Sequence, residues 1–273
     1  MSGIAGVASS SATSLGSDTI LRFDGLATGF GEGPNVVQDV DLEIRAGEFV
    51  TVLGPSGCGK STILNVACGL LKARAGTVSF AGRPLVGVNT SVGYMTQGDT
   101  LLPWRTVADN VALPLRLRGV SRQVIRERVA SSLDMLELGD SARRYPAQLS
   151  GGMKRRALLA RSMIYEPAML VMDEPFAALD AQLRTQLQVE LRRTVADARQ
   201  TVLFVTHDID EAVLVSDRVL VLGGRPAAPI ADIAIDLGPD RDAETIRFDE
   251  RFRQLEQRVH AALVQARPAE EER

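Results

Sequence analysis

A glycine-rich loop constrains the fold of this chain more than any other feature of its sequence. The segment GPSGCGKST, residues 54–62, follows the apolar run FVTVL and precedes the helix-forming run TILNVACGLL. It fits the pattern G-x-x-x-x-G-K-[ST] in a strand–loop–helix setting. Gly54, Gly57 and Gly59 let the backbone curl so that successive N–H groups converge on phosphate oxygens, and the dipole of the following helix adds positive potential there. The segment therefore predicts a phosphate-binding loop.

Side chains in and beyond the loop complete a triphosphate site. Lys60 supplies a mobile cation for the β- and γ-phosphates, and the Ser61 hydroxyl suits Mg²⁺. After the apolar run AMLVM, Asp173 would hold Mg²⁺ through water, and Glu174 is placed to polarise an attacking water as general base. These patterns predict binding and hydrolysis of a nucleoside triphosphate. The residues of the loop predicted to bind the nucleotide are Gly54, Pro55, Ser56, Gly57, Cys58, Gly59, Lys60, Ser61 and Thr62.

Strand-like and helix-like segments alternate along most of the 273 residues. ILRFDGL and VVQDVDLEI alternate apolar and polar residues as half-exposed strands do, whereas residues 107–138 carry Leu, Val and Ile at helical spacing. Alternating strands and helices favour a mostly parallel sheet with helices on its faces. We therefore predict an α/β fold: a P-loop NTPase (RecA-like) core with a mixed, mostly parallel sheet, an N-terminal antiparallel β part and an inserted α-helical subdomain.

The sequence divides into three parts. Residues 1–19, rich in Ser, Gly and Ala, are predicted to be a disordered tail. Residues 20–225 form the predicted main domain, with its helical subdomain at about residues 100–160, and residues 226–273 form a C-terminal strand and an amphipathic helix. Five apolar residues of this last part are predicted to lie on one packing face of the helix: Phe248, Phe252, Leu255, Val259 and Leu263.

Composition indicates which partners and which cellular environment to expect for the protein. A formal net charge of −3 provides no basic field for nucleic acid, so no nucleic-acid partner is expected. The two cysteines, Cys58 and Cys68, indicate a reducing cytosol rather than a disulfide scaffold. No segment approaches the ~18 consecutive apolar residues of a membrane-spanning helix. The sequence is that of an ordinary globular protein.

A second anion-binding pattern lies far from the first. In QLSGGMKRRALLAR, residues 148–161, Ser-Gly-Gly stands directly before a basic, helix-prone run. Such a helix start suits an anion because its N–H groups and dipole favour negative charge. One nucleotide site uses a single phosphate-binding loop, so within one subunit this second pattern has no ligand of its own.

Five elements together resemble the nucleotide-binding subunit of an ATP-binding-cassette (ABC) transporter. In chain order they are GPSGCGKST, YMTQ, LSGGM, VMDEP followed by FAALD, and TVLFVTHD. The resemblance covers residues 20 to about 225 and is highly specific as a set. It implies that two cassettes face each other head to tail, so that the Ser-Gly-Gly helix start of one closes over the γ-phosphate held by the other.

The resemblance also implies residue roles. Ser150, Gly151 and Gly152 would contact the γ-phosphate of the opposite cassette. Asp180 would organise the dimer seam. Further roles fall on residues at strand ends: Gln97 would reach Mg²⁺ and the attacking water, His207 would bond the γ-phosphate and align Glu174 with the water, Phe30 would stack on adenine, and Val36 would pad the ribose.

The sequence departs from the family pattern at two positions. Met153 stands where glutamine is usual in the LSGGM segment, so the hydrogen bonds that a glutamine would make there are in doubt, and Thr96 replaces an aromatic residue before Gln97. LLPWRTVADNVALPLRLRGV, residues 101–120, resembles importers of the nitrate/sulfonate/taurine type. In such importers a groove receives a permease helix, and Trp104 either lines that groove or caps the local core. The candidate lining residues are Leu101, Leu102, Trp104 and Arg105.

We therefore expect an ATPase subunit of a bacterial importer, peripheral at the cytoplasmic face of the inner membrane, that uses ATP and Mg²⁺. Its expected partners are a second copy of itself, membrane-spanning permease subunits and, indirectly, an extracytoplasmic solute-binding protein. The permease and the binding protein choose the solute, so the cargo stays open among small anionic or organic solutes such as nitrate, sulfonates and taurine.

Two alternatives come from other functional classes. A soluble ABC-type ATPase of DNA repair would carry a long coiled coil between its two anion loops, and a translation factor would carry two cassettes. This chain shows no heptad run and one cassette. A simple P-loop kinase would leave LSGGM and His207 without a role, and a GTPase would normally carry an NKxD-like guanine-reading motif, which this sequence lacks. We therefore favour the transporter.

Overall fold

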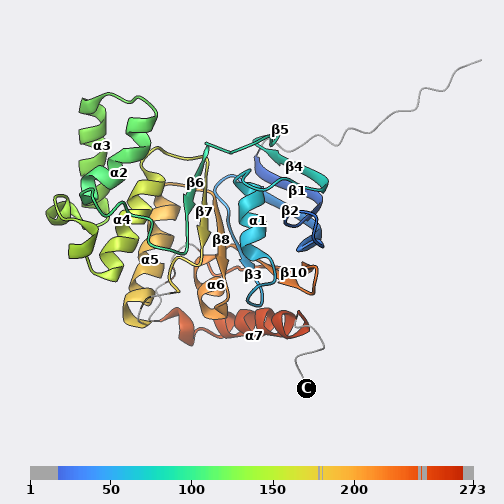
Figure 1. Ribbon diagram of the computed structural model, residues 1–273. Helices are drawn as coiled ribbons and strands as arrows, with labels where there is room; N and C mark the ends of the chain where they lie inside the picture. The colour runs from blue at the N-terminus through green and yellow to red at the C-terminus, as the bar shows by residue number, and fades with distance from the viewer. Residues whose placement is uncertain (1–17, 178, 180, 239–240, 242–244, 267–273) are drawn as a thin grey trace, which may run out of the picture.

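Two β-sheets and seven α-helices make up the described part of the protein, residues 18–177, 179, 181–238, 241 and 245–266 of a computed structural model (Figure 1). The strands are β1 (Thr19–Thr28), β2 (Val37–Arg45), β3 (Phe49–Leu53), β4 (Ala75–Phe80), β5 (Arg83–Pro84), β6 (Val92–Met95), β7 (Met169–Asp173), β8 (Val202–Thr206), β9 (Arg218–Gly223) and β10 (Ala228–Ala234). The helices are α1 (Lys60–Ala67), α2 (Val107–Leu117), α3 (Arg122–Met135), α4 (Gly151–Met163), α5 (Ala181–Asp197), α6 (Ile209–Val215) and α7 (Glu250–Gln265).

The larger sheet has six strands in the order β10-β9-β3-β8-β7-β6. Its strands β9, β3, β8, β7 and β6 run parallel, and β10 pairs antiparallel with β9 at the edge. Every residue of β3 and of β8 is buried. Such continuous apolar strands are typical of a parallel sheet that is covered on both faces.

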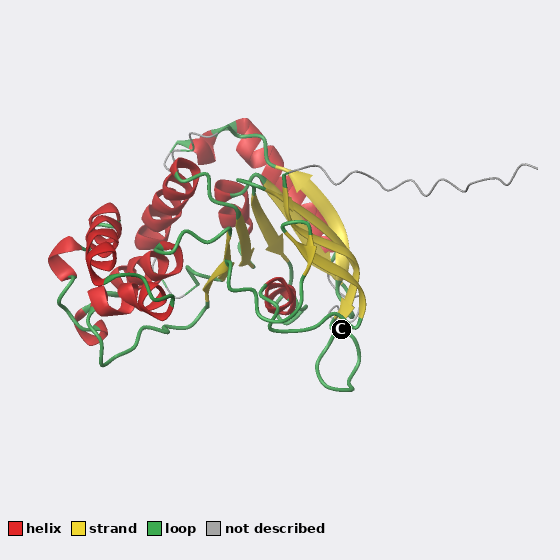
Figure 2. Ribbon diagram, turned by 90° about the horizontal axis from the view of Figure 1, so that it is seen from above, coloured by secondary structure: helices red, strands yellow, loops and turns green. Residues whose placement is uncertain are grey.

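The smaller sheet is antiparallel, with the order β2-β1-β4-β5. Seen from above, its long curved strands lie on one side of the molecule, and the main group of helices lies on the other (Figure 2). The predicted fold class, with a mostly parallel sheet, an N-terminal antiparallel part and inserted helices, is confirmed.

Alternate side chains of the parallel strands fill two separate hydrophobic cores. Phe49 and Leu53 of β3 pack with the helices of one face, and Val50 and Val52 pack with α1 and the antiparallel sheet on the other. Strand geometry explains the division, because successive side chains point to opposite faces. The parallel sheet is therefore held from both sides.

Helices α2, α3 and α4 form a group beyond edge strand β6 (Figure 1). Each begins at a residue whose hydroxyl accepts a hydrogen bond from a backbone N–H one turn later, at 3.1 Å for Thr106, 3.5 Å for Ser121 and 3.3 Å for Ser150. Such capping satisfies one of the N–H groups that a helix start leaves without a partner. Among the helices in the described part of the chain, none has the length and apolarity needed to cross a bilayer.

The C-terminal strand and helix pack onto the main sheet, but the prediction that Phe248 lies on the packing face is wrong. Phe252, Leu255 and Val259 of α7 are buried as predicted, and Leu263 is partly buried against the same core. Phe248 lies before the helix, in a 3₁₀ turn, and 76% of its surface is exposed. The reason is local: Asp249 caps the helix, because its Oδ1 accepts the Arg251 N–H at 2.7 Å, so α7 begins at Glu250.

Replacing the buried and the exposed phenylalanine separately tests this packing. Phe252→Ala is expected to lower the free energy of unfolding by about 3–5 kcal/mol, because it leaves a cavity under α7. Phe248→Ala is the matched control and is expected to change it by less than about 0.5 kcal/mol. Urea denaturation followed by circular dichroism measures both, and equal losses would contradict the packing described.

Candidate active site

The predicted site residues lie at the carboxyl ends of four neighbouring parallel strands. The glycine-rich loop leaves β3, His207 follows β8, Asp173 and Glu174 end and follow β7, and Gln97 lies just beyond β6. In open α/β sheets, ligands bind at this edge because the carboxyl ends of parallel strands meet there. The fold thus brings together residues that span positions 54 to 207 of the sequence.

The glycine-rich loop has a backbone that only glycine accommodates at its tightest point. Gly59, the residue before α1, has a φ of 108°. A Cβ at this position would lie 2.8 Å from Cγ1 of Val37 and 2.9 Å from Cγ1 of Val36. Because residue 59 has no side chain with which to cap α1, the first N–H groups of the helix remain directed at the loop. This arrangement suits a phosphate group.

Lys60 is held inside the loop. Its side chain is buried, and Nζ donates hydrogen bonds to the carbonyl oxygens of Gly54 and Pro55, both at 2.9 Å. A lysine ammonium has three donors, so these two bonds leave one for a phosphate oxygen. The geometry fits the predicted role of Lys60.

Oxygen ligands for a divalent cation lie beside the loop. Burial raises the pKa of the Asp173 carboxyl, while a hydrogen bond from Ser61 lowers it, the nearby charge of Glu174 raises it and that of Lys60 lowers it. The Ser61 hydroxyl and the Asp173 carboxyl are therefore neighbours. Mg²⁺ prefers such oxygen ligands, with one or two carboxylates completed by phosphate oxygens and water. The two residues fit the predicted metal site.

The Glu174 carboxylate lies close to side chains from the ends of two other strands. Its Oε2 lies 3.3 Å from Nε2 of Gln97 and 3.2 Å from Nδ1 of His207. Its side chain is 17% exposed, whereas that of His207 is 54% exposed. The backbone of Glu174 has a φ of 43°, and its N–H donates to the carbonyl of Val205 at 2.9 Å. Such strained backbone persists only where the surroundings hold it, and it clusters at functional sites. The carboxylate is thus held in one orientation.

Sequence reasoning missed a set of basic residues that hold the Gln97 segment. Arg155 of α4 donates to the Gln97 carbonyl at 2.6 Å, and Arg161 donates to the Thr100 carbonyl and hydroxyl at 2.8 and 2.6 Å. Lys154 pairs with Asp99 at 3.2 Å. The basic run was visible in the sequence, but its partners are mostly backbone carbonyls, which no residue pattern identifies. These contacts join α4 to the segment that carries Gln97.

The second anion loop forms an open helix start. Ser150 and Gly151 are exposed, and Ser150 caps α4. Gly152 is buried, since a Cβ there would lie 2.8 Å from Cδ2 of Leu183. Met153 is partly buried against the main core, so apolar packing stands where a glutamine would make hydrogen bonds. Helix α4 packs on β6 and α2, whereas α1 packs on β7 and β8. The two anion loops therefore precede helices that lie in different parts of the molecule (Figure 1).

Three of the predicted residues have roles that the contacts described above do not address: Phe30, Val36 and Asp180. Val36 lies against Gly59 of the loop, and Phe30 is 58% exposed in a segment whose carbonyls Arg74 holds. Asp180 lies outside the described residues. The roles given to these residues stay predictions.

The segment before α2 corrects one expectation. Trp104 is 71% exposed, so it does not cap a core. Leu101 is buried in the main core and is therefore not available to line a groove. Leu102 and Arg105 are partly exposed.

Comparisons with known proteins agree with this geometry. A family model described as "ABC transporter" matches residues 37–177. The nitrate import ATP-binding protein NrtD of Synechococcus elongatus is 40% identical over 227 residues, which cover 82% of this chain and 83% of that protein. The aliphatic sulfonates import ATP-binding protein SsuB of Bacillus licheniformis is 40% identical over 211 residues, which cover 76% of this chain and 82% of that protein.

A solved structure shares the fold. It is the dimeric, post-hydrolysis state of an ATP-binding cassette bound to ADP and phosphate, with a TM-score of 0.69 and 29% sequence identity. The match covers 79% of this chain and 99% of that one.

A methyl group at Gly59 tests the loop. Gly59→Ala adds a backbone strain of at least about 1 kcal/mol and a clash with Val36 and Val37. We expect nucleotide binding, measured with a fluorescent ATP analogue, to be lost. Gly82→Ala is the matched control, because Gly82 also has a positive φ, of 73°, but a Cβ there would contact nothing within 4 Å. Unchanged binding in Gly59→Ala would contradict the loop geometry.

Proposed function

Since the chain belongs to the ABC transporter family, we propose that it is the ATP-hydrolysing subunit that energises an importer of small anionic or organic solutes. Family membership confirms the predicted ATPase activity coupled to transport and the predicted use of ATP and Mg²⁺. The observation that carries the proposal is the convergence of Gln97 and His207 on Glu174, beside the loop that holds Lys60.

In the proposed reaction, the oxygen of a water attacks the γ-phosphorus of ATP, the bond to the β-phosphate oxygen breaks, and ADP and phosphate leave. Lys60 and the N–H groups of the loop hold the phosphates. The Glu174 carboxylate accepts the proton of the water, and Gln97 and His207 keep that carboxylate aimed at it. Mg²⁺ held by Ser61 and Asp173 would neutralise charge on the phosphate oxygens.

The second anion loop supports a dimer as the working unit. Its helix start is open, with Ser150 and Gly151 exposed, and α4 packs on other elements than α1 does. In a head-to-tail pair with two-fold symmetry, each loop reaches the γ-phosphate bound by the other chain, and the role predicted for Asp180 is to organise the seam. ATP then binds between two chains, and its hydrolysis separates them.

Opening and closing of the dimer would drive separate permease subunits at the cytoplasmic face of the membrane, with an external solute-binding protein delivering the cargo. The exposed Trp104 supports a permease contact on the segment before α2, because large exposed aromatic residues are enriched at interfaces. The nitrate and sulfonate import relatives support a cargo of that class.

The base can be tested by removing its charge. Glu174→Gln keeps the shape of the side chain but cannot accept the proton, so turnover is expected to fall by roughly 10²–10⁴-fold while ATP binding is kept. With ATP, this variant should accumulate as a dimer in size-exclusion chromatography. Full hydrolysis by Glu174→Gln would refute the assignment, and a variant that stays monomeric with ATP bound would refute the shared site.

Permease binding can be tested at Trp104. The chain is co-expressed with its cognate permease subunits, and the complex is isolated through a tag on the permease. Trp104→Ala is expected to reduce the co-purified ATPase at least several-fold, because a central aromatic residue dominates such contacts. Phe248→Ala, at another exposed aromatic position, is the control and should leave the yield unchanged. Equal yields would refute Trp104 as a contact.

A further inference from the structure

Helix α6 begins two residues after His207, so its placement determines where the histidine lies. Asp208 caps the helix, with Oδ1 accepting the Glu211 N–H at 3.1 Å. The helix has only 7 residues. Helices shorter than about 12 residues are marginal by themselves, so α6 depends on contacts with the rest of the protein.

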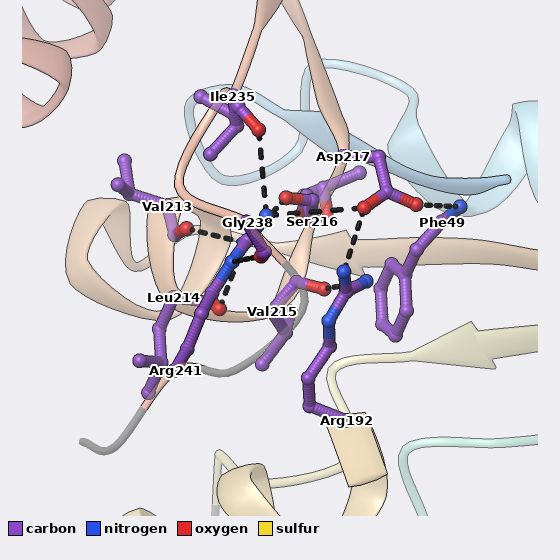
Figure 3. A network of polar contacts seen from close by, with 11 residues as sticks. Phe49, Arg192, Val213, Leu214, Val215, Ser216, Asp217, Ile235, Gly238 and Arg241 are labelled. Carbon is purple, nitrogen blue, oxygen red and sulfur yellow. Dashed lines mark hydrogen bonds and ion pairs between the residues drawn. The ribbon is translucent and has the colours of Figure 1, made fainter. Parts of the chain in front are cut away.

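The C-terminal end of α6 is held by Arg241, a residue of the C-terminal extension (residues 226–273). The Arg241 guanidinium is buried and donates to the carbonyl oxygens of Val213, Leu214 and Ser216 at 3.1, 3.0 and 2.6 Å (Figure 3). It also donates to the Ile235 carbonyl at 3.3 Å. The last carbonyls of a helix carry partial negative charge and lack partners within the helix, so a guanidinium satisfies them.

Arg241 belongs to a larger network that reaches the parallel sheet (Figure 3). Arg192 of α5 donates to the Val215 carbonyl at 3.2 Å and pairs with Asp217 at 2.8 Å. The other oxygen of Asp217 accepts the Phe49 N–H, at the start of β3, at 2.9 Å. Burial lowers the pKa of Arg241 to about 10, with the charge of Arg192 adding to the effect and that of Asp217 opposing it. The guanidinium stays charged at neutral pH, and its hydrogen-bond partners are backbone carbonyl oxygens.

The N-terminal end of α6 is held by the same extension. Arg247 pairs with Asp210 in the first turn of α6 at 2.6 Å. Helix α7 packs along α6, with Phe252 fully buried in the main core. Two arginines of one extension therefore bind the two ends of the helix that follows His207.

We propose that the C-terminal extension positions His207 for hydrolysis: Arg241 and Arg247 hold the two ends of α6 and so set the orientation of the imidazole toward Glu174. This rests on the proposed function, in which His207 aligns the base. Arg241 and Arg247 are positioning residues, since neither touches the reacting groups. The sequence alone predicts a packing helix in this extension and does not mark Arg241 or Arg247.

The imidazole can be observed directly, because the chain has 2 histidines, and the other, His260, is exposed on α7. In full-length protein labelled with ¹³C at histidine, Arg247→Ala and Arg241→Ala are expected to shift the His207 signal and leave the His260 signal in place. Arg253→Ala is the matched control, because Arg253 lies in the same extension and donates to the Phe248 carbonyl rather than to α6. Arg247→Lys, which keeps the cation, should restore the signal in part.

Kinetics separates positioning from general stability. Both arginine variants are expected to lower kcat for ATP roughly tenfold, since misplacing a catalytic group by about 1 Å can cost up to about a hundredfold. KM for ATP should stay within about twofold, because Lys60 and its loop are untouched. In a His207→Ala background the same arginine variants should cause no further loss.

Three outcomes would overturn the proposal. In the first, the arginine variants lower the melting temperature but leave the His207 signal and kcat unchanged. In the second, they lower kcat equally with and without His207. In the third, Arg253→Ala has the same effects. If Arg241→Ala does not fold, the half-exposed Arg247 decides the question. A wild-type protein that hydrolyses no ATP would refute the proposed function, whereas the His207 signal would still report whether the extension orients the imidazole.

Discussion

The side-by-side placement of four parallel strands is the constraint on which the rest of the structure depends. Strands β3, β8, β7 and β6 are neighbours, so their carboxyl ends present a phosphate-binding loop, a histidine, two carboxylates and a glutamine along one edge. The sheet is buried on both faces, and the two cores prevent its strands from shifting. A rigid sheet is what allows short contacts such as those at Glu174 to persist, because a shift of one residue in a strand would turn every side chain to the other face.

Hydrogen bonds near this edge connect the start of α4 with the segment that carries Gln97. In the proposed dimer, the start of α4 would bind the nucleotide of the other subunit, whereas Gln97 would serve the nucleotide of its own subunit. Helix α4 begins with the open Ser150 loop, and its basic residues bind the segment that carries Gln97. Gln97 in turn contacts Glu174. A movement of α4 would therefore reach Glu174, the proposed base of its own subunit, through a continuous set of hydrogen bonds. In a head-to-tail dimer, this set would connect the two nucleotide sites, and the nearby exposed Trp104 would place a permease contact beside it.

The C-terminal extension supports the helix that follows His207. It continues the main sheet through β10, covers α6 with α7, and places Arg241 at the carbonyl end of α6. A hydrophobic contact alone would allow the short helix to slide, whereas charge-assisted hydrogen bonds at both ends hold it at one position. The helix that follows His207, the neighbour of Glu174, is thus supported by a segment that lies far from it in the sequence.

Local patterns in the sequence determined the phosphate-binding loop, the buried strands, the Asp-Glu pair at a strand end and the capped start of α4, because each depends on residues close together along the chain. The same patterns failed where a neighbour in space decides. Phe248 shares the helical spacing of Phe252, yet the cap at Asp249 leaves it outside the helix, and Leu101 is buried although its segment is exposed. Arg155 and Arg241 act on backbone carbonyls, which every residue carries, so nothing in the sequence marks their partners. Only the packed chain determined which carbonyls lie within their reach.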